Sequence, residues 1–176
     1  MKNKLKYLLL LLVFITLGVF KPFTVAIIDG NSMSPTLKNG NLRVSNNIRK
    51  AKVGDVVIFH PIEDWDKKDR LYIKRMVAGP GDHISVEDNI IYINGKRYIN
   101  IKDYFNEGLI DIEFDIKDGY CFLAGDNIGY SKDSLYFFIK SNFRKNFLVP
   151  TKNIQGVFKE ESMRGDVYDY VKSYYE

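Results

Sequence analysis

Short apolar runs, each ended by glycine, asparagine or aspartate, make up most of the chain beyond residue 28, and no long stretch repeats with a helical period. Runs of about four to eight apolar residues between turn-forming residues are typical of β-strands. We therefore expect a mainly β fold. The expected strands cover residues 24–29, 42–45, 55–60, 71–78, 83–87, 90–94, 120–124 and 154–159.

Two local patterns add a hairpin and a terminal helix to these strands. The run IIYINGKRY carries Asn94-Gly95, which predicts a type I′ hairpin turn because both central residues of that turn need positive φ. In the tail, residues 161–176, the apolar and aromatic side chains have a helix-like spacing, so a short helix is expected there. Residues 102–117 and 136–147 carry no clear pattern.

The N-terminal segment combines three lysines with an apolar run over residues 7–20. A cleavable signal peptide has the same outline, but it ends in a small-x-small site. Here the run ends in the bulky and charged sequence VFKP, so an uncleaved transmembrane anchor over residues 1–22 is the preferred interpretation. Three lysines before the run and one after it predict a single-pass plasma-membrane protein with a cytoplasmic N-terminus and an extracytoplasmic domain.

The formal charge of +4 belongs to this anchor rather than to the rest of the chain. Residues 1–28 hold four lysines and no acid, so the remaining 22 basic and 22 acidic side chains cancel. A neutral domain gives no reason to expect a nucleic-acid partner, whereas the anchor makes the lipid bilayer one. The sequence sets no oligomeric state.

The composition predicts one folded domain behind the anchor. About 150 residues remain, enough for one well-packed core. The 45% of hydrophobic and 14% of aromatic residues argue against disorder. We expect this domain over residues 23–160, with residues 161–176 as a tail. The single cysteine, Cys121, lies in the apolar run YCFLA and is expected to be buried without a disulfide.

The residue inventory favours a lysine over a histidine as the base of any serine chemistry. The two histidines, His60 and His83, are expected at the surface or at strand ends, and with one cysteine they do not supply a zinc ligand set. Neither a metal nor a cofactor is therefore expected. A lysine can act as a base when burial lowers its pKa. Lys74 fits best because it interrupts the apolar run LYIKRMVA, although the pattern is equally compatible with a strand lysine that faces solvent.

The stretch NSMSPTL contains the two candidate nucleophiles, Ser32 and Ser34. A nucleophilic serine needs an exposed position on a tight turn, with backbone N–H groups near the reacting carbonyl. Pro35 favours an extended Ser34, which leaves Ser32 at the bend. On its own, such a turn is more typical of a cap or a loop than of an active site.

Four segments, taken in order, resemble the successive motifs of bacterial type I signal peptidases. They are IDGNSMSPTL, GDVVIF, YIKRMVAGPGD and GDNIGYSKDS, and the resemblance extends from about residue 6 to residue 156. It implies a signal-peptidase-like domain of antiparallel β-sheet behind one N-terminal transmembrane helix. It also implies a membrane-anchored serine endopeptidase that removes signal peptides from exported preproteins after small-x-small sites.

The resemblance assigns roles to individual residues. Ser32 corresponds to the nucleophile and Lys74 to the general base. Ser131 matches the serine whose hydroxyl orients that lysine, and Asp133 matches the acid that pairs with Arg75. Gly30 occupies the position of an oxyanion-hole serine in some members, which leaves the Ser32 N–H as the donor. The substrate pocket implied by the family is built from Ile28, Met33, Leu37, Tyr72 and Ile73.

The chain departs from the family motif after Ser134. Leu135 stands where the motif has an arginine, and a longer link, LYFFIKSNFRKNFL, follows. These departures leave two roles open, a housekeeping enzyme and a specialised paralogue that processes a few substrates such as pilins. Aromatic residues of this link and Trp65 are expected at the membrane interface, in the core or at a subunit contact. Two rival functions are a self-cleaving repressor, which should carry a DNA-binding segment in place of the anchor, and a non-catalytic peptide-binding assembly factor.

Overall fold

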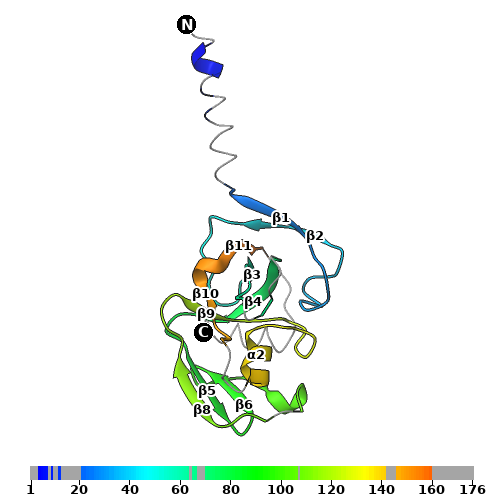
Figure 1. Ribbon diagram of the computed structural model, residues 1–176, viewed down its shortest axis with the longest axis vertical. Helices are drawn as coiled ribbons and strands as arrows, with labels where there is room; N and C mark the ends of the chain where they lie inside the picture. Colours follow the sequence, from blue (N-terminus) through cyan, green and yellow to red (C-terminus); the bar gives the residue numbers. More distant parts are fainter. Residues whose placement is uncertain are drawn as a thin grey trace.

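Two antiparallel β-sheets form the framework of the computed structural model, which describes residues 4–7, 9, 12, 21–63, 65–66, 70–106, 108–141 and 146–159 (Figure 1). The seven-stranded sheet has the order β1 (Phe23–Ile27), β2 (Leu42–Asn46), β11 (Ile154–Phe158), β3 (Val56–Phe59), β4 (Tyr72–Ala78), β9 (Tyr120–Ala124) and β10 (Val149–Pro150). The four-stranded sheet has the order β7 (Lys96–Asn100), β6 (Ile90–Ile93), β5 (His83–Glu87) and β8 (Ile112–Asp115). Beyond residue 20, the described part of the chain forms the helix α2 (Ser134–Ser141) and the 3₁₀ turns η1 (Ile101–Asp103) and η2 (Thr151–Asn153), and residues 4–7 are also helical.

The mainly β prediction is confirmed, and every expected strand is present with ends shifted by at most two residues. The hairpin at Asn94-Gly95 is also confirmed, since the two residues have φ of 51° and 73° and join β6 to β7. The sequence patterns missed β8, β10 and α2. The predicted terminal helix and residue 160 of the predicted domain lie outside the described residues.

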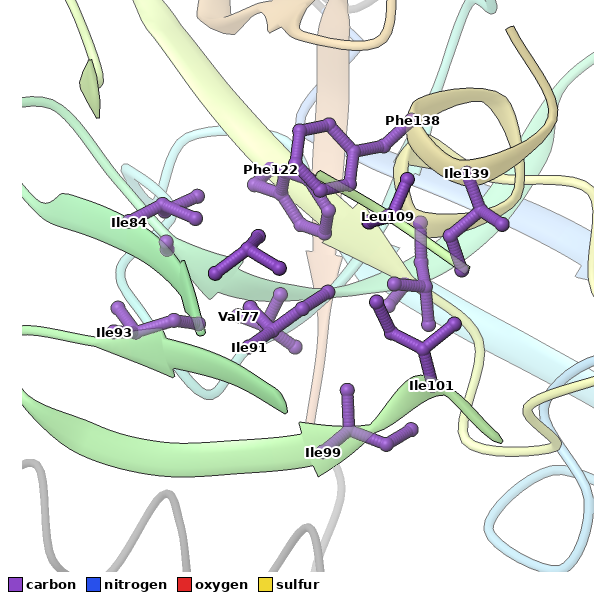
Figure 2. Close-up of a cluster of buried hydrophobic side chains, with 14 of the residues drawn as sticks. Val77, Ile84, Ile91, Ile93, Ile99, Ile101, Leu109, Phe122, Phe138 and Ile139 are labelled. Carbon is purple, nitrogen blue, oxygen red and sulfur yellow. The ribbon is translucent and has the colours of Figure 1, made fainter. Parts of the chain in front are cut away.

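The main core lies between the four-stranded sheet, β9 and α2. β5 and β6 each alternate buried apolar residues with more exposed ones, as a half-exposed sheet requires, and Ile112 and Phe114 of β8 are partly buried on the same core. Figure 2 shows isoleucines of β5, β6 and β7 facing Phe122 of β9 and Phe138 of α2. Cys121 of β9 is fully buried as predicted, and burial raises the pKa of its thiol to about 12.

The aromatic residues after Ser134 pack in the core, which confirms this alternative over the membrane interface. Phe138 is fully buried, and the ring of Phe137 stacks on Trp65 with 5.0 Å between centroids. Leu135, which replaces the expected arginine, is 1% exposed and packs in the main core. The departure from the family motif is thus the start of an apolar helix face.

A second set of buried side chains supports the NSMSPTL turn. Met33 and Leu37 of the turn and Ile28 before it pack with Val56 and Ile58 of β3. The turn therefore rests on the seven-stranded sheet by the burial of its own apolar residues. Asn31, Ser32 and Ser34 remain at least partly exposed, whereas Thr36 is buried with the apolar residues.

No helix within the described residues is long and apolar enough to cross a membrane. Most of residues 1–22 lie outside the described part, so the anchor remains a prediction.

Candidate active site

The NSMSPTL turn connects β1 to β2 and places Ser32 beside β4. Gly30 before it has φ of 94°, a left-handed conformation that glycine adopts without strain, and its N–H donates to Asn39 Oδ1 over 2.9 Å. The Asn127 N–H donates to Ser32 O over 3.0 Å. The turn is therefore held from both sides at its backbone.

Lys74 lies in the middle of β4 and meets Ser32. Its side chain is 4% exposed, and its Nζ donates to Ser32 Oγ over 2.8 Å and to Ile73 O over 2.9 Å. Burial lowers the pKa of Lys74 to about 8, while the charges of Asp133 and Asp126 oppose this shift. The sequence pattern left a buried and a solvent-facing Lys74 equally open, and the structure shows the buried one. A lysine with this pKa is partly neutral near physiological pH and can accept a proton from the serine.

Ser131 is buried near the Ser32 backbone, but its Oγ has no hydrogen-bond partner within the part of the chain that the structure describes. The expected bond from Ser131 to Lys74 is therefore not formed here. A Cβ on Gly125 would lie 2.5 Å from Ser32 O and would also collide with the Ser131 side chain. Only glycine at position 125 lets the GDNIGYSKDS segment approach the serine turn this closely.

Asp133 is fully buried and caps α2. Its Oδ1 accepts the N–H of Tyr136 over 2.9 Å, and its Oδ2 accepts the N–H of Gly125 over 2.7 Å. Burial raises the pKa of Asp133, whereas the charge of Lys74, the nearby hydroxyl of Ser131 and the two N–H groups oppose the rise. The charge of the Asp133 carboxylate thus raises the pKa of Lys74 without a hydrogen bond between them, and its hydrogen bond to the Tyr136 N–H stabilises the start of α2.

The predicted pairing of Arg75 with Asp133 is wrong, because Arg75 pairs with Asp126. Arg75 Nε and Nη2 donate to the two Asp126 oxygens over 2.8 and 2.6 Å, and Nη1 donates to Gly54 O over 2.6 Å. The Thr36 hydroxyl also donates to Asp126. Successive strand residues point to opposite faces, so Arg75 turns away from the lysine side. Thr36 and Asp126 were missed, although both lie in quoted motifs.

A cleft of about 490 Å³ opens beside Ser32 and Lys74. One wall is β1 with the start of the serine turn, and the other is formed by residues 70–74. Of the predicted pocket residues, Ile28, Met33, Tyr72 and Ile73 line it, as do Ser32 and Lys74. Leu37 is not among its lining residues, because it is fully buried in the core beneath the turn.

Known proteins resemble this chain over most of its length. The family model described as "Signal peptidase, peptidase S26" matches residues 1–167. Signal peptidase I of Bacillus caldolyticus is 32% identical over 139 residues, which cover 68% of this chain and 74% of that protein. Signal peptidase IB of Staphylococcus aureus is 33% identical over 142 residues, covering 68% and 70%. The chain belongs to the signal peptidase family.

The family assignment confirms the resemblance predicted from the four motifs and makes this protein a serine endopeptidase. A crystal structure of a signal peptidase I from Enterococcus faecalis also matches, with a TM-score of 0.43 and 23% identity over 63% of this chain and 98% of that chain. Neither histidine of this peptidase lines the cleft. No group of three or more possible metal ligands occurs among its described residues.

The charge of Asp133 gives a pH test of this geometry. Asp133→Asn removes a negative charge that raises the pKa of Lys74, so that pKa falls and the acid limb of kcat/KM moves to lower pH by about one unit. Asparagine is also a good N-cap, which favours retention of α2. The pH profile of peptide cleavage checks this, with Asp115→Asn on the exposed β8 edge as control. An acid limb that stays in place would contradict the coupling.

Proposed function

We propose that this peptidase removes signal peptides from exported preproteins, cutting after small-x-small sites with a Ser32/Lys74 dyad. The contact of 2.8 Å between Lys74 Nζ and Ser32 Oγ carries the proposal. A buried lysine with a pKa of about 8, bonded to a serine in a cleft, matches the requirements of an activated nucleophile. The family assignment supports the substrate class.

The reaction proceeds in two halves. Neutral Lys74 accepts the Ser32 hydroxyl proton as Oγ attacks the scissile carbonyl carbon. The C–N bond then breaks, the lysine proton passes to the leaving amine, and the signal peptide remains esterified to Ser32. Water attacks this ester after giving a proton to Lys74, and that proton returns to Oγ as the ester bond breaks.

We assign the Ser32 N–H as the oxyanion donor. The Gly30 N–H already donates to Asn39 Oδ1 over 2.9 Å, so it is not assigned to the oxyanion. A backbone N–H on the nucleophile itself moves with the reacting oxygen and needs no further side chain.

The cleft suits an extended peptide with small side chains. Among the described strands β1 is at the edge of its sheet, and an edge strand can bind a peptide backbone by β-augmentation. The dyad end of the cleft is lined by Ile28, Met33 and Ile73. Large substrate residues would overpack against these side chains, which gives a physical reason for a small-x-small preference.

An exposed apolar face supports the lipid bilayer as partner and the plasma membrane as location. Phe23, Val25 and Ile27 of β1 alternate outward with exposures of 58, 64 and 70%, and Leu42 and Val44 of β2 lie beside them. This face directly follows the predicted anchor, at the end of the described domain opposite the four-stranded sheet (Figure 1). With the anchor, it would hold the cleft at the extracytoplasmic surface.

A specialised paralogue remains the second candidate. It is favoured by Leu135, which stands in place of the motif's arginine and lies in the apolar helix α2 (Ser134–Ser141), and by the longer link. A substrate range restricted to a few preproteins such as pilins would distinguish it from a general enzyme. The intact contact between Lys74 and Ser32 argues against a non-catalytic peptide-binding factor.

Cleavage of a defined preprotein tests the proposal. The full-length protein in detergent micelles is expected to cut a preprotein bearing Ala-x-Ala once, directly after the second alanine. Phenylalanine in place of that alanine should lower kcat/KM at least about 100-fold, since it does not fit the small pocket. Mass spectrometry of the products locates the cut. No cleavage of the Ala-x-Ala substrate, or equal cleavage of both, would overturn the proposal.

A further inference from the structure

Asp66 lies outside the dyad, but it binds two side chains that line the cleft. Arg70 Nε and Nη2 donate to Asp66 Oδ2 over 3.0 and 2.5 Å, and the Tyr72 hydroxyl donates to the same oxygen over 3.2 Å. The Asp66 side chain is 12% exposed, whereas that of Arg70 is 59% exposed. One largely buried carboxylate therefore holds both Tyr72 and Arg70 in the wall of the cleft, which Lys132 and Asp29 also line.

Trp65 anchors the backbone that carries Asp66. Its ring stacks on Phe137 of α2 and meets Phe59 of β3 edge-on at 6.1 Å. Its Nε1 donates to Asn146 O over 3.0 Å. The link that departs from the family motif thus holds the residue next to Asp66 in place. Asp66 is fixed by packing that this chain builds from its own additional segment.

Tyr72 connects Asp66 to the dyad. Lys74 Nζ lies 5.5 Å from the centroid of the Tyr72 ring, within the range of a cation–π contact. The same ring packs edge-on against Phe59 at 6.1 Å. Burial and the charge of Asp66 raise the pKa of Tyr72, so its hydroxyl stays protonated and remains a donor to Asp66. A shift of Asp66 would therefore move the cleft wall next to the base.

We infer that Asp66 is a positioning residue for substrate recognition: it fixes the Tyr72 ring as a wall of the cleft and neutralises Arg70 at its mouth. The cleft then favours an extended peptide segment with uncharged side chains. Without the carboxylate, Tyr72 loses its acceptor and the Arg70 cation becomes free to attract an acidic peptide. This inference rests on the proposed function and adds the charge preference of its substrate.

Peptide binding to Ser32→Ala protein tests the inference without turnover. Trp65 is the only tryptophan of the chain and adjoins Asp66, so its fluorescence reports binding of a tryptophan-free peptide. Asp66→Ala is expected to raise the Kd of an uncharged Ala-x-Ala peptide about tenfold, the effect of losing bonds to a charged group. In the active chain the same change should raise KM while kcat changes much less.

Asp66→Asn keeps the side-chain shape and isolates the charge. Relative to the uncharged Ala-x-Ala peptide, a peptide with one aspartate before the cleavage site should bind several-fold better to Asp66→Asn than to the chain with Asp66. Adding Arg70→Gln to Asp66→Asn should reverse this change in preference. Asp55→Ala is the matched control. Asp55 pairs with Arg49 over 2.7 Å and has the same side-chain exposure of 12%, but it lies away from the cleft.

The outcomes separate this inference from the proposed function. Weaker binding in Asp66→Ala but not in Asp55→Ala, with the reversible charge preference in Asp66→Asn, supports it. Equal effects of the two alanine variants, or an unchanged preference in Asp66→Asn, overturn it even when the unsubstituted chain cleaves Ala-x-Ala. Failure of that chain to cleave overturns the proposed function instead.

Discussion

Ser32→Ala is expected to abolish signal-peptide cleavage, with kcat lowered by about 10⁵-fold or more, as in other serine peptidases that lose the nucleophile. The reason is geometric, because the Ser32 Oγ is the hydroxyl bonded to the buried amine of Lys74. Ser34, two residues later in the same turn, is the matched control, and Ser34→Ala should keep kcat within about threefold of the original value.

Quantification of the two products over time checks this pair of variants. Cleavage that survives in Ser32→Ala and disappears in Ser34→Ala would reassign the nucleophile. A thermal melt of each variant shows whether the turn still folds, and little change is expected, since Met33 and Leu37 supply the buried contacts.

Lys74→Met is expected to lower kcat by at least about 10³-fold, because no other base lies against Ser32 among the described residues. The same substitution should also change how the free energy of unfolding depends on pH. The folded protein holds Lys74 with a pKa of about 8, whereas an unfolded lysine has its ordinary value of 10.5. Between these two values the unfolded chain binds a proton that the folded chain does not. The free energy of unfolding of the unsubstituted protein should therefore rise by about 3 kcal/mol from pH 8 to 10.5 relative to Lys74→Met.

Denaturant unfolding followed by Trp65 fluorescence measures this difference at several pH values. Below pH 8 both states carry the proton, so the full cost of burying the ammonium is present and the difference is constant. If the difference in the free energy of unfolding between the two proteins does not change between pH 8 and 10.5, the pKa of Lys74 is not lowered in the folded state. Lys117 is exposed and serves as the control. The difference in the free energy of unfolding between the unsubstituted protein and Lys117→Met should not change between pH 8 and 10.5.

Local patterns were sufficient for most strands, because strand formation depends on alternation and on the turn residues at each end. The Asn94-Gly95 turn is the clearest case, since its two positive φ values follow from the residues themselves. The short helix α2 escaped prediction because its sequence, SLYFFIKS, is an apolar run as typical of a strand as of a helix. Its helical state depends on the Asp133 cap and on packing against β9.

The candidate site also has features that the sequence could predict and features that it could not. The apolar neighbours of Lys74 made it the best candidate base but did not decide which face of the strand it lies on, and the motifs singled out Ser32. The partner of Arg75 could not be predicted, because Asp126 and Asp133 occur in one motif only seven residues apart and either could face an arginine. The structure places Asp126 against Arg75 and directs Asp133 to the helix N-terminus.

By itself, the sequence determined the strand-rich fold, the family and the candidate dyad, because apolar alternation, turn chemistry and ordered motifs are local properties. Only the tertiary structure decided that Leu37 is core rather than pocket, that Asp126 pairs with Arg75, and that Asp66 holds Tyr72. Each of these depends on which side of a strand or loop meets a distant segment. That is set by packing over the whole domain, where burial and charge pairing are satisfied together.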